Sequence, residues 1–122
     1  MSKRLHLIGP VNEPQKYALM HHADLVILPS RFEGLSIVAI EALASSSAII
    51  ASGIQPLREA LGDAAVYFNA GDEQDLAAKM SLALASGASQ GGLRSQARER
   101  SMLFSVRRMV DGYVRAYEKA AS

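Results

Sequence analysis

Short apolar runs alternate with amphipathic stretches along most of this sequence. Runs rich in branched aliphatic residues and only a few residues long are typical of buried parallel strands. The expected strands are residues 5–8, 25–28, 48–51 and 65–68. Between them the apolar positions recur at helical spacing. The expected helices are residues 13–22, 37–45, 57–61 and 73–85.

Two helix starts carry capping signals. Asn12 followed by Gln15 matches a capping box, and Asp72 is placed to cap the helix that begins at residue 73. Leu76, Met80 and Leu84 are expected to form the inner face of that helix.

The end of the chain has a different character. Residues 86–92 are rich in Ser, Gly and Gln and predict a mobile connector, followed by helices over 93–103 and 106–120. Arginines concentrate in these last helices, and the simplest interpretation is a solvated face. A docking face for a partner domain or an acidic membrane is the alternative.

Strand–helix alternation predicts right-handed crossovers and a parallel sheet covered by helices. The expected fold class is therefore α/β, with a Rossmann-like parallel sheet of about four strands in chain order. We expect residues 1–122 to form a single domain, since no repeat or second domain is visible.

Composition narrows the function classes. The 122 residues are 49% hydrophobic, contain no cysteine and have a net charge of +1, with 13 basic and 12 acidic residues. This balance gives no overall field to attract nucleic acid or anionic lipid. The chain has no run long enough to span a membrane and none that resembles a signal peptide. We expect a soluble, cytoplasmic domain that binds no nucleic acid.

The chemistry concentrates in residues 29–42, between the second expected strand and the helix after it. Gly34 allows close backbone approach, and Ser36 is a good N-cap candidate. A helix N-terminus at the carboxyl end of a parallel strand suits an anion. Glu33 and Glu41 suit hydroxyl groups, because carboxylates accept their hydrogen bonds. Amides for a diphosphate and carboxylates for two sugars together indicate a nucleotide-sugar.

The segment PSRFEGLSIVAIEALA, residues 29–44, resembles the donor-site motif of the large retaining glycosyltransferase family usually numbered four. That family has the GT-B fold and holds its donor in a C-terminal Rossmann-like domain. Its mark is a Glu, seven residues and another Glu, which Glu33 and Glu41 match in spacing. The resemblance continues, in the expected order, through residues 5–11, 23–30, 48–52, 57–68 and 70–80. It covers nearly the whole chain.

The resemblance implies roles for individual residues. Glu33 would be the catalytic-site carboxylate beside the donor sugar, and Glu41 would bind the ribose. Gly34, Leu35 and Ser36 would offer backbone amides to the diphosphate or the sugar. Each role has a plainer alternative. Glu33 would then be a solvated loop carboxylate, Glu41 an exposed helix carboxylate and Gly34 an ordinary turn glycine.

Two further donor contacts follow from the same resemblance. Arg31 would assist the phosphates, although side chains vary at this family position, and Gly9 would contact the base. No metal or other cofactor is expected, because amides and cationic side chains serve the phosphates. Residues 45–47 replace a stretch where the family commonly has a glycine, and residues 52–55 depart from the usual loop.

A family member would also carry an N-terminal acceptor domain and two further strand–helix units that supply an Arg and a Lys. We therefore expect this polypeptide alone to transfer sugar poorly or not at all. Its expected partners are the donor, the missing acceptor domain and a second copy bound through exposed strand edges. Direct pairing of strands 5–8 and 25–28 is the first choice. The rival interpretation is a non-catalytic α/β assembly module or an inactive fragment.

Overall fold

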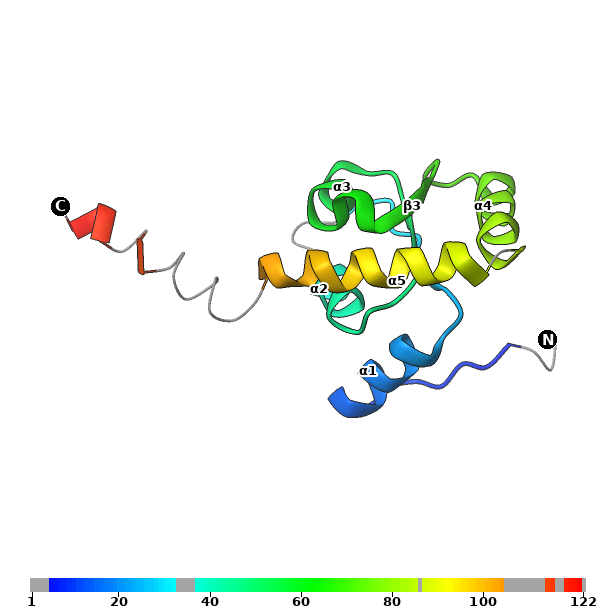
Figure 1. Ribbon diagram of the computed structural model, residues 1–122, viewed down its shortest axis with the longest axis horizontal. Helices are drawn as coiled ribbons and strands as arrows, with labels where there is room; N and C mark the ends of the chain where they lie inside the picture. The colour runs from blue at the N-terminus through cyan, green and yellow to red at the C-terminus, as the bar shows by residue number, and fades with distance from the viewer. Residues whose placement is uncertain (1–4, 33–36, 86, 105–113, 116–117, 122) are drawn as a thin grey trace.

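The computed structural model of the chain describes residues 5–32, 37–85, 87–104, 114–115 and 118–121 (Figure 1). Its helices and strands are, in order, α1 (Glu13–His22), β1 (Val26–Leu28), α2 (Ile37–Ala44), β2 (Ile49–Ser52), α3 (Gln55–Leu61), β3 (Ala65–Phe68), α4 (Glu73–Ala85) and α5 (Gly87–Ser101). Two 3-10 turns, Gly62–Ala64 and Met102–Phe104, follow α3 and α5.

The three strands form one parallel sheet in the order β1-β2-β3. Successive side chains of a strand point to opposite faces, and the core divides accordingly. Ile49 and Ala51 of β2 belong to a cluster with buried residues of α2, α3 and α5, whereas Ile50 packs with Phe68 and Ala83 of α4. The predicted α/β class, with a parallel sheet between helices, is confirmed.

The predicted strand over residues 5–8 is wrong. This segment forms no strand, and Leu5, Leu7 and Ile8 are 56%, 82% and 60% exposed. A strand exists only when its backbone groups pair with a neighbour. In the described part of the chain nothing pairs with residues 5–8 or with the outer edge of β1, so the sheet has three strands there instead of about four.

The capping predictions for Asn12 and Asp72 are confirmed. Asn12 Oδ1 accepts from Gln15 N at 2.9 Å, and Gln15 Oε1 accepts from Asn12 N at 3.2 Å, which completes the box. Asp72 Oδ1 accepts from Asp75 N at 3.0 Å at the start of α4. Leu84, predicted to face inward, is 50% exposed, because the buried stripe of α4 ends in Ala83 instead.

The predicted connector over residues 86–92 is also wrong, since α5 starts at Gly87. Glycine in a helix is unfavourable by about 1 kcal/mol relative to Ala, but tertiary contacts can outweigh that preference. Here α5 contacts α2, α4, β2 and the 3-10 turn after α3, and Ala97 is fully buried. Figure 1 shows α5 running beside α2 and α3 along the body of the molecule. Most of the helix predicted over 106–120 lies outside the described residues.

Two of the arginines expected on a solvated face are structural instead. Arg94 donates from Nη1 to His21 O at 2.9 Å and Ser46 O at 3.2 Å, and from Nη2 to Ala23 O at 2.6 Å. Arg100 donates to Ala60 O at 3.1 Å and Glu59 O at 2.7 Å. Helix C-termini leave carbonyls without intrahelical partners, and cations near them are favourable. These side chains therefore fasten α5 to the ends of α1, α2 and α3.

The end of α2 has a left-handed residue where a glycine is usual. Ser46 has φ +53°, Ser46 N donates to Leu43 O at 3.0 Å, and Ser47 N donates to Ala42 O at 3.2 Å. This hydrogen-bond pair is the Schellman motif, in which the left-handed position favours glycine because it has no Cβ. The departure from glycine in residues 45–47 therefore falls at a position of backbone strain.

Candidate functional site

The carboxyl edge of the parallel sheet carries a pocket of about 190 Å³. Ligands of open α/β sheets bind at this edge, outside the ends of the strands. The residues that line the pocket come from the loop after β1, the end of β3 and the start of α4: Pro29, Arg31, Phe68, Gly71, Asp72, Glu73 and Leu76. The pocket therefore adjoins the segment that the sequence singles out.

Arg31 brings a positive charge to this pocket. Its side chain is exposed and lies directly against Gly71, so that a Cβ at residue 71 would stand 2.8 Å from Arg31 Nη2. Gly71 also has a backbone φ of +81°, a conformation that residues other than glycine rarely adopt. Among the described residues Arg31 has no carboxylate within ion-pair distance. Within this part of the chain its guanidinium is thus available to an anion, and its role at the phosphates stays a prediction.

A buried hydroxyl fixes the start of the loop that leads from β1 into the motif. Ser52, at the end of β2, is fully buried, and its Oγ donates to the carbonyl of Ser30. The bond joins the loops that leave two neighbouring strands at the same edge. The start of the loop after β1 is therefore held in place by a residue of the neighbouring strand, β2.

Sequence reasoning missed a second cation at this edge. Arg58 Nε donates to Gly53 O at 3.0 Å, and its guanidinium carbon lies 4.4 Å from the centroid of the Tyr67 ring. Gly53 follows β2 directly, so Arg58 stands at the carboxyl end of that strand. The sequence places Arg58 in the short helix after β2, but no local pattern in it indicates the contacts with Gly53 O and the Tyr67 ring.

Four predicted site residues, Glu33, Gly34, Leu35 and Ser36, lie outside the described residues. They connect Phe32 to the first residue of α2, Ile37. The predicted strand before the motif and the predicted helix after it are therefore both present, as β1 and α2. The roles of these residues stay predictions.

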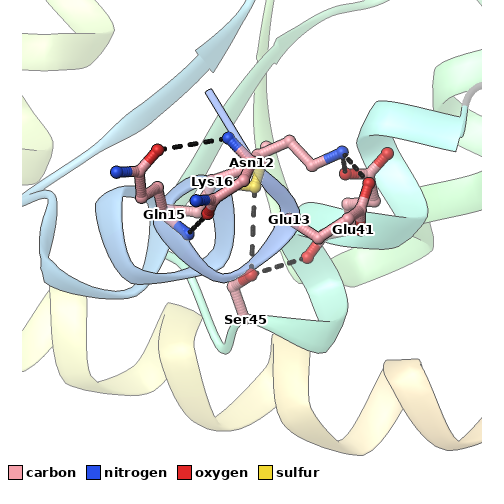
Figure 2. Close-up of polar contacts among 7 residues, drawn as sticks. Asn12, Glu13, Gln15, Lys16, Glu41 and Ser45 are labelled. Atoms are coloured by element: carbon pink, nitrogen blue, oxygen red, sulfur yellow. Dashed lines mark hydrogen bonds and ion pairs between the residues drawn. The ribbon is translucent and has the colours of Figure 1, made fainter. Parts of the chain in front are cut away.

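Glu41, the predicted ribose ligand, is a buried carboxylate on α2 with 8% of the residue exposed. Its Oε2 lies 2.5 Å from Nζ of Lys16 on α1, close enough for a strong ion pair. The same Nζ lies 2.9 Å from Glu13 Oε1 (Figure 2). Among the described residues this buried Oε2 has no hydrogen bond of regular geometry, so the ammonium is its partner through charge.

The two carboxylates change the pKa of Lys16. The contact with Glu41, and after it the contact with Glu13, raise the pKa of Lys16 above its ordinary value. Lys16 therefore remains charged at neutral pH. Lys16 has no evident site role in the sequence, because its place three residues after Glu13 indicates only a helix-surface pair.

Gly9 is not among the residues that line the pocket at the sheet edge. It lies in the exposed segment before α1 and has φ +66°, with open space around the position of a Cβ. Its predicted contact with the base stays a prediction.

The described residues offer neither a membrane-spanning helix nor a cluster of metal ligands. None of the helices found there is long and apolar enough to cross a membrane. In the same part of the chain, no cluster of three or more His, Asp or Glu side chains is placed to hold a metal ion.

Residues 1–100 match the family model of the glycosyl transferases group 1. The chain belongs to this family. The glycosyltransferase resemblance drawn from residues 29–44 is thereby confirmed.

Curated relatives cover almost the whole chain. The MMP alpha-(1->4)-mannosyltransferase of Mycolicibacterium hassiacum is 30% identical over 98% of the chain, and the D-inositol 3-phosphate glycosyltransferase of Geodermatophilus obscurus is 35% identical over 96%. This group 1 chain spans only 30% and 26% of the lengths of those two relatives.

A solved structure extends the agreement to the fold. The sucrose-phosphate synthase of Thermosynechococcus elongatus superposes with a TM-score of 0.70 at 28% identity, covering 82% of this chain and 26% of that protein. The group 1 domain described here therefore has the architecture of part of a GT-B, Rossmann-like fold.

Proposed function

We propose that this group 1 domain binds the nucleotide-diphospho-sugar donor of a retaining glycosyltransferase. The observation that carries the proposal is the cation of Arg31, available in a pocket at the carboxyl edge of the sheet and directly before the Glu33–Glu41 motif. A diphosphate needs positive charge at such an edge, and an arginine fork matches phosphate oxygens well.

The motif residues complete the proposed site. The amides of residues 34–36 would donate hydrogen bonds to the diphosphate, while Glu33 would accept hydrogen bonds from hydroxyls of the sugar beside the bond that breaks. In retaining transfer the nucleoside diphosphate leaves through an oxocarbenium-like transition state. Preorganised donors on the leaving group stabilise such a state most effectively. No metal has a part in this proposal.

Transfer also needs an acceptor site and a closed, dry cleft. We propose that these come from the rest of a complete enzyme, including an acceptor domain, and that this chain alone binds donor but transfers sugar poorly or not at all. The relatives, of which this chain spans less than a third, support that division. A cytoplasmic location is part of the same proposal.

Binding of UDP, GDP and ADP, followed by backbone amide shifts, tests the proposal. We expect shifts in residues 29–41 for one of the three nucleotides. Arg31→Gln should weaken that binding by roughly tenfold or more, since a hydrogen bond to a charged group is worth about 1.5–3 kcal/mol. Arg98→Gln, an exposed arginine on α5, is the matched control and should bind as the wild type does. Absence of shifts at millimolar nucleotide would overturn the donor-binding role.

A second candidate function, assembly with another polypeptide, has an observation of its own. A groove of about 680 Å³ lies between Ile8, Val11 and residues of α1, and Leu5 and Leu7, in the segment before α1, are also exposed. Apolar patches and unpaired strand edges favour association. Sedimentation of the wild type and of Leu7→Lys distinguishes the candidates, because an assembly module should self-associate and lose that association in the variant.

A further inference from the structure

Lys16 joins two carboxylates that come from different helices. Its Nζ lies 2.9 Å from Glu13 Oε1 on its own helix, α1, and 2.5 Å from Glu41 Oε2 on α2. Figure 2 shows the ammonium reaching across from α1 to Glu41, with the capping-box residues Asn12 and Gln15 at the start of the same helix. The ammonium of Lys16 is therefore held between two carboxylates, one from each helix.

Glu41 depends on this contact. Its side chain is only 11% exposed, and a buried carboxylate is unfavourable unless a cation or hydrogen bonds compensate it. Lys16 is the one cation of the described residues within ion-pair distance of Glu41. The ammonium occupies Oε2, so the orientation of the carboxylate follows the position of Lys16.

Orientation matters for the ribose-binding role that the family resemblance implies for Glu41. A carboxylate recognises ribose by accepting hydrogen bonds from hydroxyl groups, and these bonds require an oxygen aimed at the hydroxyl. A side chain held by a second group makes such bonds without first losing its rotational freedom.

We propose that Lys16 is a positioning residue for donor binding: it holds Oε2 of Glu41 so that Oε1 accepts from a ribose hydroxyl of the nucleotide. This inference rests on the proposed function and deepens it. It assigns to α1, which buries none of its own residues, a part in the recognition of ribose.

The test compares UDP, GDP and ADP with their 2′,3′-dideoxy counterparts, by amide shift titration of the whole chain. Lys16→Met should weaken the ribonucleotide by about tenfold and leave the dideoxynucleotide unchanged, because only the ribose bonds depend on Glu41. Lys16→Arg, which keeps the charge, should recover part of the loss. Lys79→Met on α4 removes a longer, more exposed ion pair, with Asp75 at 3.6 Å, and should change neither affinity.

Three results would overturn the inference. Equal weakening of both nucleotides by Lys16→Met would show a purely structural role, and tighter ribonucleotide binding would show that Lys16 competes with the ligand. Failure of the wild type to bind any of the nucleotides would overturn the donor role itself, and this inference with it. The first two results leave the donor role intact.

The double variant keeps the test decisive if Lys16→Met does not fold. Lys16→Met/Glu41→Gln has no buried, unpaired carboxylate at this position. The inference predicts that it binds the ribonucleotide as Glu41→Gln alone does, since Lys16 acts through Glu41. A further loss of severalfold in the double variant would contradict that route.

Discussion

Arg94 offers the sharpest test of how this domain holds its helices. It donates to three backbone carbonyls, those of His21, Ala23 and Ser46, at 2.9, 2.6 and 3.2 Å. Substitution by Met keeps the aliphatic part of the side chain and removes every donor. The carbonyls at the ends of α1 and α2 then lose their charged partner.

The expected magnitude follows from these contacts. One hydrogen bond to a charged group contributes about 1.5–3 kcal/mol, but the three contacts share one side chain and water can reach part of the site. We therefore expect Arg94→Met to lower the free energy of unfolding by about 2–4 kcal/mol, a large part of the roughly 5–15 kcal/mol of an ordinary domain. The free energy of unfolding of Arg94→Lys should lie between those of the wild type and Arg94→Met, because an ammonium keeps the charge but cannot reproduce the planar fork of a guanidinium.

Arg98 is the matched control, one helical turn further along α5. It is exposed, and its Nε lies 3.5 Å from Ser46 Oγ, which is at the limit of a hydrogen bond. Arg98→Met should change stability by no more than about 0.5 kcal/mol. Urea unfolding followed by circular dichroism measures both variants. If the midpoints of Arg94→Met and Arg98→Met coincide, the contacts of Arg94 do not stabilise the fold as argued.

Two further predictions concern backbone strain and pH. Ser46→Gly should raise the free energy of unfolding by about 0.5–1 kcal/mol, because it relieves the left-handed strain but frees the unfolded chain, whereas Ser46→Ala should give no gain in the same urea assay. Tyr67→Phe removes a 2.6 Å bond from Tyr67 Oη to Gly62 O and should lower stability at pH 7 by about 1 kcal/mol. Burial raises the pKa of Tyr67 above 10.0, so its contribution is complete below about pH 10 and is lost as the pH rises through the folded-state pKa. Unfolding at pH 8 and pH 11 should therefore show a smaller alkaline loss in Tyr67→Phe, and an unchanged loss would contradict the assignment to this phenol.

Local signals in the sequence were sufficient where the structure depends on local physics. The capping box at Asn12 and the strand Ala65–Phe68 were predictable because hydrogen bonds within one turn and continuous apolar runs determine them. The segment 5–8 has an equally apolar sequence but forms no strand, because strand formation depends on a neighbour that no local pattern reveals. The glycines at the start of α5 led to the opposite error: a connector was predicted where a helix forms, since packing outweighed their low helix propensity.

The candidate site divides in the same way. The position of the motif between β1 and α2, and the place of Arg31 at the sheet edge, follow from the alternation of strands and helices. Arg58 and Lys16 were not predictable as site residues, because each acts through a contact with another element. Spacing within a motif does not encode such contacts.

The arginine contacts of α5 also have a consequence for the order in which the domain is completed. Arg94 bonds to carbonyls 73, 71 and 48 residues earlier, and Arg100 to carbonyls 40 and 41 residues earlier. During synthesis the sheet and the helices α1 to α3 leave the ribosome before their final partners exist. Long-range contacts of this kind form late and slowly. A nascent chain stalled near residue 85 should therefore be open to proteases at the ends of α1, α2 and α3, and should close when α5 emerges.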